Sequence, residues 1–404
     1  MTAGVRGTRS EGNSRGPLCG LVVVDLSRAL AGPHAAMMLG DLGAEVVKVE
    51  NVNGGDDTRG WGPPFVDASD GGRESTYFLC ANRNKKSVTL DLKSPDGRNS
   101  LERLLRSADV LIENFRTGVL DRLGFSLRRL AELNERLVVL SISGFGHDGP
   151  EACRAGYDQI AQGEGGLMSV TGSSAADLQR VGVPIADLLA GMYGAFGVLA
   201  ALHERRHTGK GQVVRTSLLA AMVGVHAFQG TRWTVAKQVG QATGNHHPSI
   251  CPYGLFDTAD GAVQIAVGSE NLWIRLCEGF GLDALAPGMA SNPERVENAA
   301  AVRELVQKVF LQYSSDELLA KLDAIGVPAG RIRSISEVYE WEQTLSQGLL
   351  IDVDHKTLGP IRLPGPPLRF FDTDGSERTR TRHTAPPVLG AHNDLLESPQ
   401  PFKT

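Results

Sequence analysis

The stretch Arg180-Val-Gly-Val-Pro-Ile-Ala-Asp187-Leu-Leu-Ala-Gly-Met-Tyr-Gly194 lies near the middle of the 404-residue chain and joins two sequence patterns. Residues 181–186 form an apolar, extended run that stops at a single acid. From that acid onward, apolar residues recur with helical spacing as far as Leu199. The pattern therefore predicts that a long helix begins at Asp187, directly after an extended segment.

Two roles are open to Asp187 at this position. An Asp side chain commonly accepts hydrogen bonds from the free N–H groups of a first helical turn, so an N-cap is the more frequent role. A carboxylate in the same place can also be a nucleophile, because the N–H groups and the helix dipole keep it ionised. The local pattern does not choose between these roles, and one residue can fill both.

Apolar runs alternate with helical or loop segments over the first third of the chain. This alternation predicts an α/β fold with a doubly wound, parallel, Rossmann-like sheet. Ser94-Pro95-Asp96, with Ser as cap and Pro in the first turn, marks one helix start between the strands. The expected strands span 21–25, 45–50, 87–91, 109–113 and 137–142, and another is expected at 213–217.

The loops that follow the first five strands should lie along one edge of the sheet, because right-handed crossovers bring the carboxyl ends of parallel strands together. Ligands of open α/β sheets bind at that edge. Gly, Asn, Lys and Arg in these loops suit a ligand that carries phosphate groups. The loops span 27–33, 51–57, 92–93, 114–116 and 144–149.

A dinucleotide is not the expected ligand. The motif G-x-G-x-x-G, which allows close backbone approach to a pyrophosphate, is missing between the first strand and its helix. The chain has Ser27-Arg-Ala-Leu-Ala-Gly32-Pro33 there instead. We therefore interpret Glu50, at the end of the second expected strand, as part of a local polar network rather than as a ribose ligand.

The composition, with 41% hydrophobic and 22% charged residues, is that of an ordinary soluble globular protein. A formal net charge of −5 argues against a nucleic-acid partner. The five cysteines form no CxxC pair, which favours a reducing compartment and argues against a zinc site. The longest apolar run, 188–202, is too short to span a bilayer. We predict a cytoplasmic protein with no membrane partner.

A chain of 404 residues is expected to form two domains. Residues 220–330 carry their own strand and helix signals and are expected to form a smaller α+β domain. These signals include a hairpin with Asp260-Gly261 as its turn and a capping box at Ser314 and Glu317. Residues 1–17, rich in Gly, Ser and Arg, are predicted to be a disordered tail rather than a signal peptide.

Several motifs stand together in the central part of the chain: Tyr157-Asp158, Gly165-Gly-Leu-Met168, Thr171-Gly172, Val181-Gly-Val-Pro-Ile-Ala-Asp187 and Ala200-Ala-Leu-His-Glu-Arg205. They resemble the central block of the family III CoA-transferases, the formyl-CoA and carnitine type, and the resemblance extends from about residue 18 to about residue 396. It implies that Asp187 is the catalytic nucleophile. It also implies that 18–219 and 331–404 form one large, discontinuous CoA-binding domain, and that two chains interlock as a homodimer.

The resemblance also implies a set of CoA-binding residues. Most of them lie on the edge of the sheet that the strand pattern predicts independently. One position differs, because Asn51 stands where formyl-CoA transferases have a basic residue. The implied residues are Leu30, Ala31, Leu90, Asp91, Leu92, Lys93, Asn114, Phe115, Arg116 and Arg122, with Arg154 one position away from an aligned lysine.

Tyr157 separates two activities within this superfamily. The related α-methylacyl-CoA racemases have a histidine where Tyr157 stands and use it as a proton carrier. Tyrosine, whose ordinary pKa is near 10, is a poor proton carrier at pH 7. The sequence therefore favours a transferase, with Tyr157 and Asp158 facing the substrate, and a racemase or isomerase of branched acyl-CoA remains the alternative.

Residues 244–248 occupy the place of the glycine-rich flap of formyl-CoA transferase, which disfavours formate and oxalate as substrates. This loop contains His246 and His247, and no Cys, His or acidic residue stands at metal-ligand spacing from them, so no metal is expected. One of the two histidines, or Ser249, is expected to contact the carboxylate of the acceptor acid.

We therefore predict a CoA-transferase that moves CoA from an acyl-CoA donor, with succinyl-CoA as one candidate, to a carboxylic acid. A small dicarboxylate such as succinate, mesaconate, itaconate or glutarate is the first expectation for the acceptor. The implied route passes through mixed anhydrides and an aspartyl-CoA thioester on Asp187. CoA enters as a substrate, and no permanently bound cofactor is expected. A third hypothesis is a protein that binds acyl-CoA but does not catalyse a reaction.

Overall fold

The computed structural model describes residues 15–398 and 402, so most of the predicted tail at 1–17 lies outside the described residues. The chain forms two compact units. The larger unit contains residues up to 167, then 181–231, and the chain from 342 onward. The smaller unit contains 168–180 and 232–341.

The borders between the units differ from the predicted ones at 219/220 and 330/331. Residues 220–231 belong to the larger unit because helix α8 (Leu218–Gly224) buries Leu218, Ala221 and Met222 in its core. Residues 168–180 join the smaller unit, where β8 (Gly172–Ser174) and β9 (Asp177–Leu178) form a two-stranded sheet.

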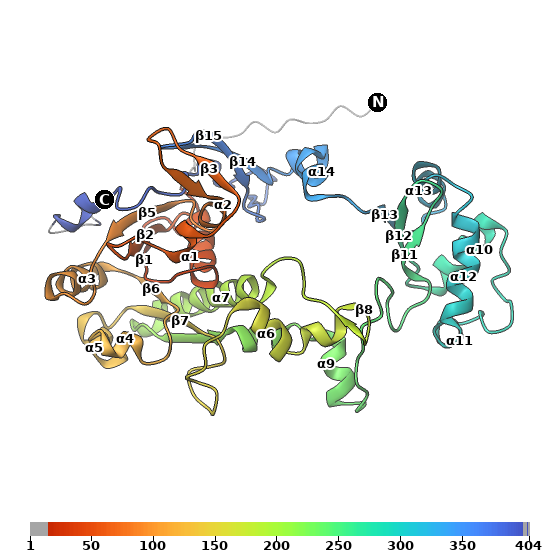
Figure 1. The fold of residues 1–404 in the computed structure, drawn as a ribbon, viewed down its shortest axis with the longest axis horizontal. Helices are drawn as coiled ribbons and strands as arrows, with labels where there is room; N and C mark the ends of the chain where they lie inside the picture. Colours follow the sequence, from red (N-terminus) through yellow and green to blue (C-terminus); the bar gives the residue numbers. More distant parts are fainter. Residues whose placement is uncertain (1–14, 399–401, 403–404) are drawn as a thin grey trace. The chain divides into compact units, whose positions relative to one another are not determined.

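A six-stranded sheet, in which every strand pair is parallel, forms the centre of the larger unit (Figure 1). Its order is β10-β7-β6-β1-β2-β5, which confirms the predicted α/β class with a parallel sheet. Numbered along the chain, this is the doubly wound order 3-2-1-4-5-6, with the switch point between β1 and β6. The strands are β1 (Val22–Asp25), β2 (Glu45–Glu50), β5 (Lys85–Thr89), β6 (Val110–Glu113), β7 (Val138–Ser143) and β10 (Val213–Ser217).

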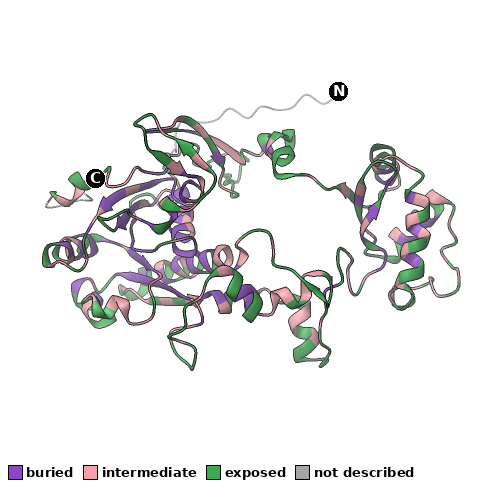
Figure 2. Cartoon of the chain, viewed as in Figure 1, coloured by how far each residue is buried: buried purple, intermediate pink, exposed green. Residues whose placement is uncertain are grey.

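Helices cover both faces of this sheet. On one face, α1 (Ala31–Asp41) and α7 (Ile185–Thr208) share a core with alternate strand residues such as Val23 and Val46. On the other face, α3 (Pro95–Ser107) and α5 (Leu127–Leu133) pack on the opposite set, which includes Val22 and Val47. Figure 2 shows the resulting burial along the strands and along α7.

Glycines let α7 lie close to its neighbours. A Cβ atom added at Gly191 would stand 2.6 Å from the backbone oxygen of Ala31 in α1. A Cβ atom at Gly194 would stand 2.8 Å from the Leu140 side chain in β7. Among the described residues, α7 is the one helix long and apolar enough to cross a membrane, and its buried residues pack in this core.

Two short sheets and several short helices complete the larger unit. The connection between β2 and β5 contains η1 (Asp57–Gly60), β3 (Phe65–Asp67), β4 (Arg73–Ser75) and α2 (Thr76–Leu79). The sequence pattern did not predict the antiparallel hairpin at residues 350–364. The remaining elements are α4 (Val119–Arg122), α6 (Asp158–Glu164), α9 (Ala227–Thr234), which crosses the unit border, α15 (Glu342–Ser346), β14 (Leu350–His355), β15 (Gly359–Pro364) and η3 (Asn393–Leu396).

The smaller unit combines a three-stranded antiparallel sheet with helices around a core that includes Phe256 and Trp273. The predicted hairpin at Asp260-Gly261 and the capping box of Ser314 and Glu317 are both confirmed. The strands are β11 (Tyr253–Asp257), β12 (Ala262–Ala266) and β13 (Ala329–Arg331); the helices are α10 (Glu270–Phe280), α11 (Asn292–Glu297), α12 (Ala299–Phe310), α13 (Ser315–Ala324) and α14 (Ile335–Glu340).

The third strand of the larger sheet begins earlier than predicted, at Lys85 instead of residue 87. Lys85 is 3% exposed, and its ammonium group pairs with Asp25 at 2.9 Å. A buried lysine is rare unless it is paired, so a lysine at this position did not extend the predicted strand. This ion pair joins residues 60 positions apart in sequence, so a local pattern could not predict it.

Candidate active site

A cavity of about 650 Å³ lies at the carboxyl edge of the large sheet. Loops that follow five of the strands line it, at Arg28, Asn51, Leu92, Asn114 and Gly144. This is the edge along which the strand order predicts ligand binding. The first turn of α7 also reaches the cavity, through Asp187.

Asp187 is not the N-cap of α7, so the cap interpretation is wrong. The helix begins at Ile185, its N-cap residue is Pro184, and no side chain of that residue caps it. Asp187 is the third helical residue. Its carboxyl group is therefore not occupied in closing the helix end, and it lines the cavity.

Asp158 closes the N-terminus of α7 in place of Asp187. Its Oδ1 atom accepts hydrogen bonds from the backbone N–H groups of Ala186 at 2.7 Å and of Asp187 at 3.4 Å. Its Oδ2 atom accepts a bond from Gln162 Nε2 at 2.7 Å. Asp158 is the first residue of α6, so one carboxylate ties the starts of two helices together beside Asp187.

The environment of Asp187 favours its protonated form. Burial, and then the negative charge of Asp158, raise the pKa of Asp187 from its ordinary value of 3.8 to about 7. A position in a first helical turn lowers the pKa of a carboxyl group, but here burial and a like charge outweigh that effect. Near neutral pH, the carboxyl group is therefore present both as the acid and as the carboxylate.

Two aromatic residues that the sequence analysis missed line the cavity near Asp187. Burial, and then the charge of Asp187, raise the pKa of Tyr77 to about 12, so its hydroxyl group stays protonated. The ring of Trp61 meets the ring of Tyr77 edge to face at 5.0 Å between centroids. Both lie in the connection 51–84 between β2 and β5, whose length is the one sequence signal for them, because long ordered connections often carry function.

Most of the predicted CoA-binding residues line the cavity, but Leu30 and Arg122 do not. Leu30 is 3% exposed and is the N-cap residue of α1, while Arg122 is exposed on α4. The predicted residues that line the cavity are Ala31, Leu90, Asp91, Leu92, Lys93, Asn114, Phe115, Arg116 and Arg154. Tyr157, whose side chain is 65% exposed, and Asp158 line it as well.

The cations of this cavity differ in their partners. Within residues 15–398 and 402, Arg28, Lys93 and Arg116 form no ion pair, and all three are exposed. Arg154 pairs with Glu164, and with Glu151 at 3.4 Å, so its charge is already balanced. Arg28 lies in the predicted ligand-binding loop 27–33 but is not among the CoA-binding residues that the resemblance implied. Arg28, Lys93 and Arg116 are therefore the cations available to an anionic ligand.

Asn114 lines the cavity, and its side chain is also hydrogen-bonded to the protein backbone. Its side chain accepts a bond from the Arg28 backbone N–H and donates one to the Arg28 carbonyl oxygen, each at 2.8 Å. Asp56 accepts a bond from the backbone N–H of Ala29 at 3.2 Å, and Ala29 has a left-handed φ of 61°. These contacts fix the loop after β1.

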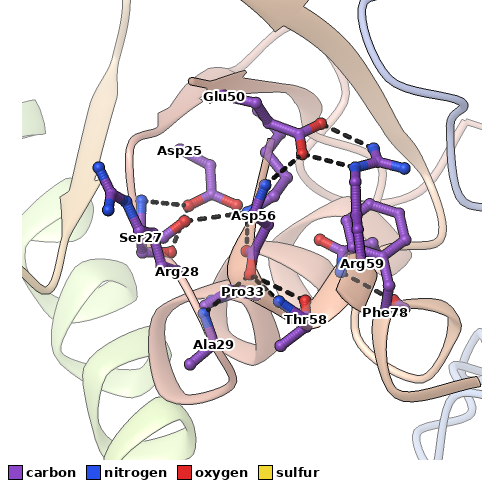
Figure 3. A network of polar contacts seen from close by, with 12 residues as sticks. Asp25, Ser27, Arg28, Ala29, Pro33, Glu50, Asp56, Thr58, Arg59 and Phe78 are labelled. Atoms are coloured by element: carbon purple, nitrogen blue, oxygen red, sulfur yellow. Dashed lines mark hydrogen bonds and ion pairs between the residues drawn. The ribbon is translucent and has the colours of Figure 1, made fainter. Parts of the chain in front are cut away.

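Buried charges beneath this loop form the network in Figure 3. Lys48 pairs with Asp56 at 2.8 Å and donates a hydrogen bond to the Ser27 carbonyl oxygen at 2.9 Å. Glu50 accepts two bonds from Arg59, each at 2.8 Å. The interpretation of Glu50 as part of a local polar network is thereby confirmed.

His246 and His247 belong to the smaller unit and are not among the residues that line this cavity. The His246 ring meets Phe256 edge to face at 5.6 Å, and the His247 ring stacks on Tyr253 at 5.2 Å. Their expected contact with the acceptor stays a prediction. Among the described residues, no group of three or more His, Cys, Asp or Glu side chains could hold a metal ion.

A family model described as CoA-transferase family III matches residues 18–393. A succinate–glutarate CoA-transferase from Agrobacterium fabrum is 40% identical over 368 residues, which cover 89% of this chain and 92% of that protein. A succinyl-CoA:glutarate CoA-transferase from Homo sapiens is 36% identical and covers 95% and 86%, respectively. The crystal structure of a CAIB/BAIF family protein from Brucella suis is similar with a TM-score of 0.82 and 39% identity, covering 95% and 99%.

Proposed function

The chain belongs to CoA-transferase family III, and we propose that it transfers CoA from succinyl-CoA to a small dicarboxylate, with glutarate as the first candidate acceptor. The names of the two relatives support this choice of substrates. The observation that carries the catalytic proposal is Asp187, a carboxyl group that caps no helix and lines the cavity at the switch point of the sheet.

Asp187 is proposed as the nucleophile. Its carboxylate attacks the thioester carbonyl of the donor, and CoA leaves as the thiolate, which yields a mixed anhydride. The thiolate then attacks the Asp187 carbonyl carbon of the anhydride, which releases the donor acid and leaves an aspartyl-CoA thioester. The acceptor carboxylate and the thiolate repeat these two steps in reverse, so that Asp187 regains its carboxylate and the acceptor leaves as its CoA thioester.

The environment of Asp187 suits this role. A carboxylate whose conjugate acid has a pKa of about 7 is more basic than an ordinary aspartate and remains substantially ionised at neutral pH. Asp158 positions Asp187 through the first turn of α7. Tyr77 keeps its proton, and its hydroxyl group is proposed as a donor to oxygen atoms that become negative during the reaction.

The phosphate groups of CoA require positive charge. Arg28, Lys93 and Arg116 are proposed to supply it, because they line the cavity and form no ion pair within residues 15–398 and 402. Asn114, which the family resemblance implied as a CoA-binding residue, is proposed to act by holding the backbone at Arg28. CoA enters this site as a substrate, and the absence of a permanently bound cofactor stays a prediction.

A cytoplasmic location also stays a prediction, as does the absence of nucleic-acid and membrane partners. All five cysteines are free in the structure, which agrees with the reducing compartment expected from their spacing. The homodimer is a further proposal, and its support lies in exposed apolar side chains of α7.

Mass spectrometry tests the nucleophile directly. We expect that incubation with succinyl-CoA followed by trapping with hydroxylamine modifies the peptide that contains Asp187, and that Asp187→Asn shows no modification. The Asp323→Asn variant, which changes an exposed carboxylate of the smaller unit, should be modified like the wild type. An equal adduct on the Asp187→Asn protein would contradict the proposal.

An acceptor panel then identifies the acid. Glutarate, succinate, mesaconate and itaconate are the expected acceptors, and formate and oxalate complete the panel as the acids that the missing flap disfavours. The racemase alternative predicts a different result, in which solvent deuterium enters the α-carbon of a branched acyl-CoA and no adduct forms on Asp187.

A further inference from the structure

A second cavity, of about 370 Å³, lies entirely within the smaller unit. Its polar lining comes from two arginines, a histidine, a glutamine and a threonine, and no acidic residue lines it. The lining residues are Arg232, Val239, Gln241, Thr243, His247, Pro248, Cys251, Val296, Ala299 and Arg303.

The two arginines carry charges that the described residues do not balance. Within residues 15–398 and 402, neither Arg232 nor Arg303 lies within ion-pair distance of a carboxylate. The neighbour of the Arg303 guanidinium is the thiol of Cys251, a residue that is 1% exposed. By contrast, Arg295 in the same unit pairs with Glu270 at 2.8 Å. Two guanidinium groups without acids at one cavity leave it positively charged.

His247 adds a neutral imidazole ring to this lining. Its Nδ1 atom accepts a hydrogen bond from the backbone N–H of Ser249 at 3.0 Å, so Nδ1 carries no proton. Burial lowers the pKa of His247, which keeps the ring neutral at pH 7. A neutral imidazole with an accepting Nδ1 carries its hydrogen on Nε2. The cavity therefore takes its positive charge from two fixed cations beside a neutral imidazole, and guanidinium groups are well suited to binding carboxylates.

We propose that this cavity binds a short dicarboxylate, with Arg232 and Arg303 as its two carboxylate-binding residues. Guanidinium groups bind carboxylates through paired, parallel hydrogen bonds, so two of them suit a molecule with two carboxylates. The volume exceeds by far the roughly 30 Å³ that a single water occupies, so a compact inorganic anion would fill little of it. The cavity and its two arginines do not depend on the proposed function, but the choice of a dicarboxylate such as glutarate rests on it.

Calorimetric titration of the full-length protein tests the site. We expect glutarate to bind the wild type at least tenfold more tightly than butyrate, which has one carboxylate. Arg303→Gln and Arg232→Gln should each weaken glutarate binding at least tenfold and remove the preference over butyrate. Arg303→Lys, which keeps the positive charge but not the planar guanidinium group, should retain part of the preference for glutarate over butyrate. Arg275→Gln, at an exposed arginine of the same unit that does not line the cavity, should bind like the wild type.

The results of these titrations distinguish glutarate binding at this cavity from the proposed reaction at Asp187. If glutarate binds Asp187→Asn as it binds the wild type, and Arg303→Gln loses binding, the site stands whether or not Asp187 forms an adduct. If correctly folded Arg232→Gln and Arg303→Gln proteins, checked by circular dichroism, bind glutarate like the wild type, the proposal is overturned. Displacement of glutarate by pyrophosphate at tenfold lower concentration would overturn it too, because the ligand would then be a phosphate anion.

Discussion

At the scale of single residues, Asp187 shows what the sequence could predict and what it could not. The strand-to-helix pattern located the residue and predicted a helix start within two positions of the observed one. The cap interpretation, one of the two that the local pattern left open, is wrong because the group that closes the helix, Asp158, lies 29 residues away in sequence from the Asp187 N–H that it binds. A local pattern shows neither the burial of Asp187 nor its tertiary contact with Asp158, so the raised pKa of Asp187 could not be predicted.

The raised pKa makes the stability of the protein depend on pH. Because the pKa of Asp187 is about 7 in the folded state and near 3.8 when unfolded, its contribution is fully present below pH 3.8 and is lost as the pH rises through 7. Asparagine cannot ionise. We therefore expect the free energy of unfolding of Asp187→Asn, relative to the wild type, to increase by about 2–3 kcal/mol between pH 5 and pH 8. Urea denaturation at the two pH values measures this difference.

An Asp158→Asn background provides the matched control. Its amide oxygen can still accept from the Ala186 N–H, but the negative charge that raises the pKa of Asp187 is gone. The pH-dependent difference should shrink in this background and stay unchanged in Asp323→Asn. Wild type and Asp187→Asn curves that run parallel from pH 5 to pH 8 would show that Asp187 titrates at an ordinary pKa.

At the scale of elements, the sequence predicted strands well where their residues are apolar and less well where charges are buried. The start of β5 was missed because Lys85 pairs with Asp25 inside the protein. The cavity residues Trp61 and Tyr77 were missed because Trp61 directly follows η1 and Tyr77 lies in α2, and these short elements between β2 and β5 have no periodic signal. In each case, the sequence pattern could not predict a contact between separate elements.

The packing of α7 on α1 leads to a prediction about Gly191. Replacement of a glycine inside a helix by alanine ordinarily stabilises the helix by about 1 kcal/mol. At Gly191, the new methyl group would stand 2.6 Å from the Ala31 carbonyl oxygen, so the two helices would have to separate. We expect Gly191→Ala to lower the free energy of unfolding by about 1–3 kcal/mol, measured by urea denaturation.

Gly268→Ala is the matched control for this prediction. No atom lies within 4 Å of a Cβ added at Gly268, and its φ is not in the left-handed region. Its stability should stay within about 0.5 kcal/mol of the wild type. A Gly191→Ala protein that is as stable as the wild type would mean that α1 and α7 do not pack as closely as the structure shows.

At the scale of the whole molecule, the class of the fold followed from the sequence, but the division into units did not. The spacing of apolar runs was enough for a parallel α/β sheet. The borders were misplaced because α8 continues the core of the larger unit past residue 219. The cavity of the smaller unit was also not foreseen, because Arg232, His247 and Arg303 come together only through tertiary packing.

The surface of α7 leads to the last prediction, which concerns assembly. Phe196 is 72% exposed in the single chain, and Met192 is 46% exposed. Large apolar groups that gather on one helix mark surfaces that other proteins cover, and a second copy of the chain is the partner that the family resemblance implies. Light scattering after size-exclusion chromatography should therefore give about twice the chain mass of 43.1 kDa. Phe196→Asp should shift the protein towards the single-chain mass, because a charge would be buried at the contact.

Leu285→Asp, at a residue of the smaller unit that is 77% exposed, is the control and should leave the mass unchanged. A wild type with the mass of one chain at micromolar concentration would rule out the homodimer and would require a complete active site within a single chain.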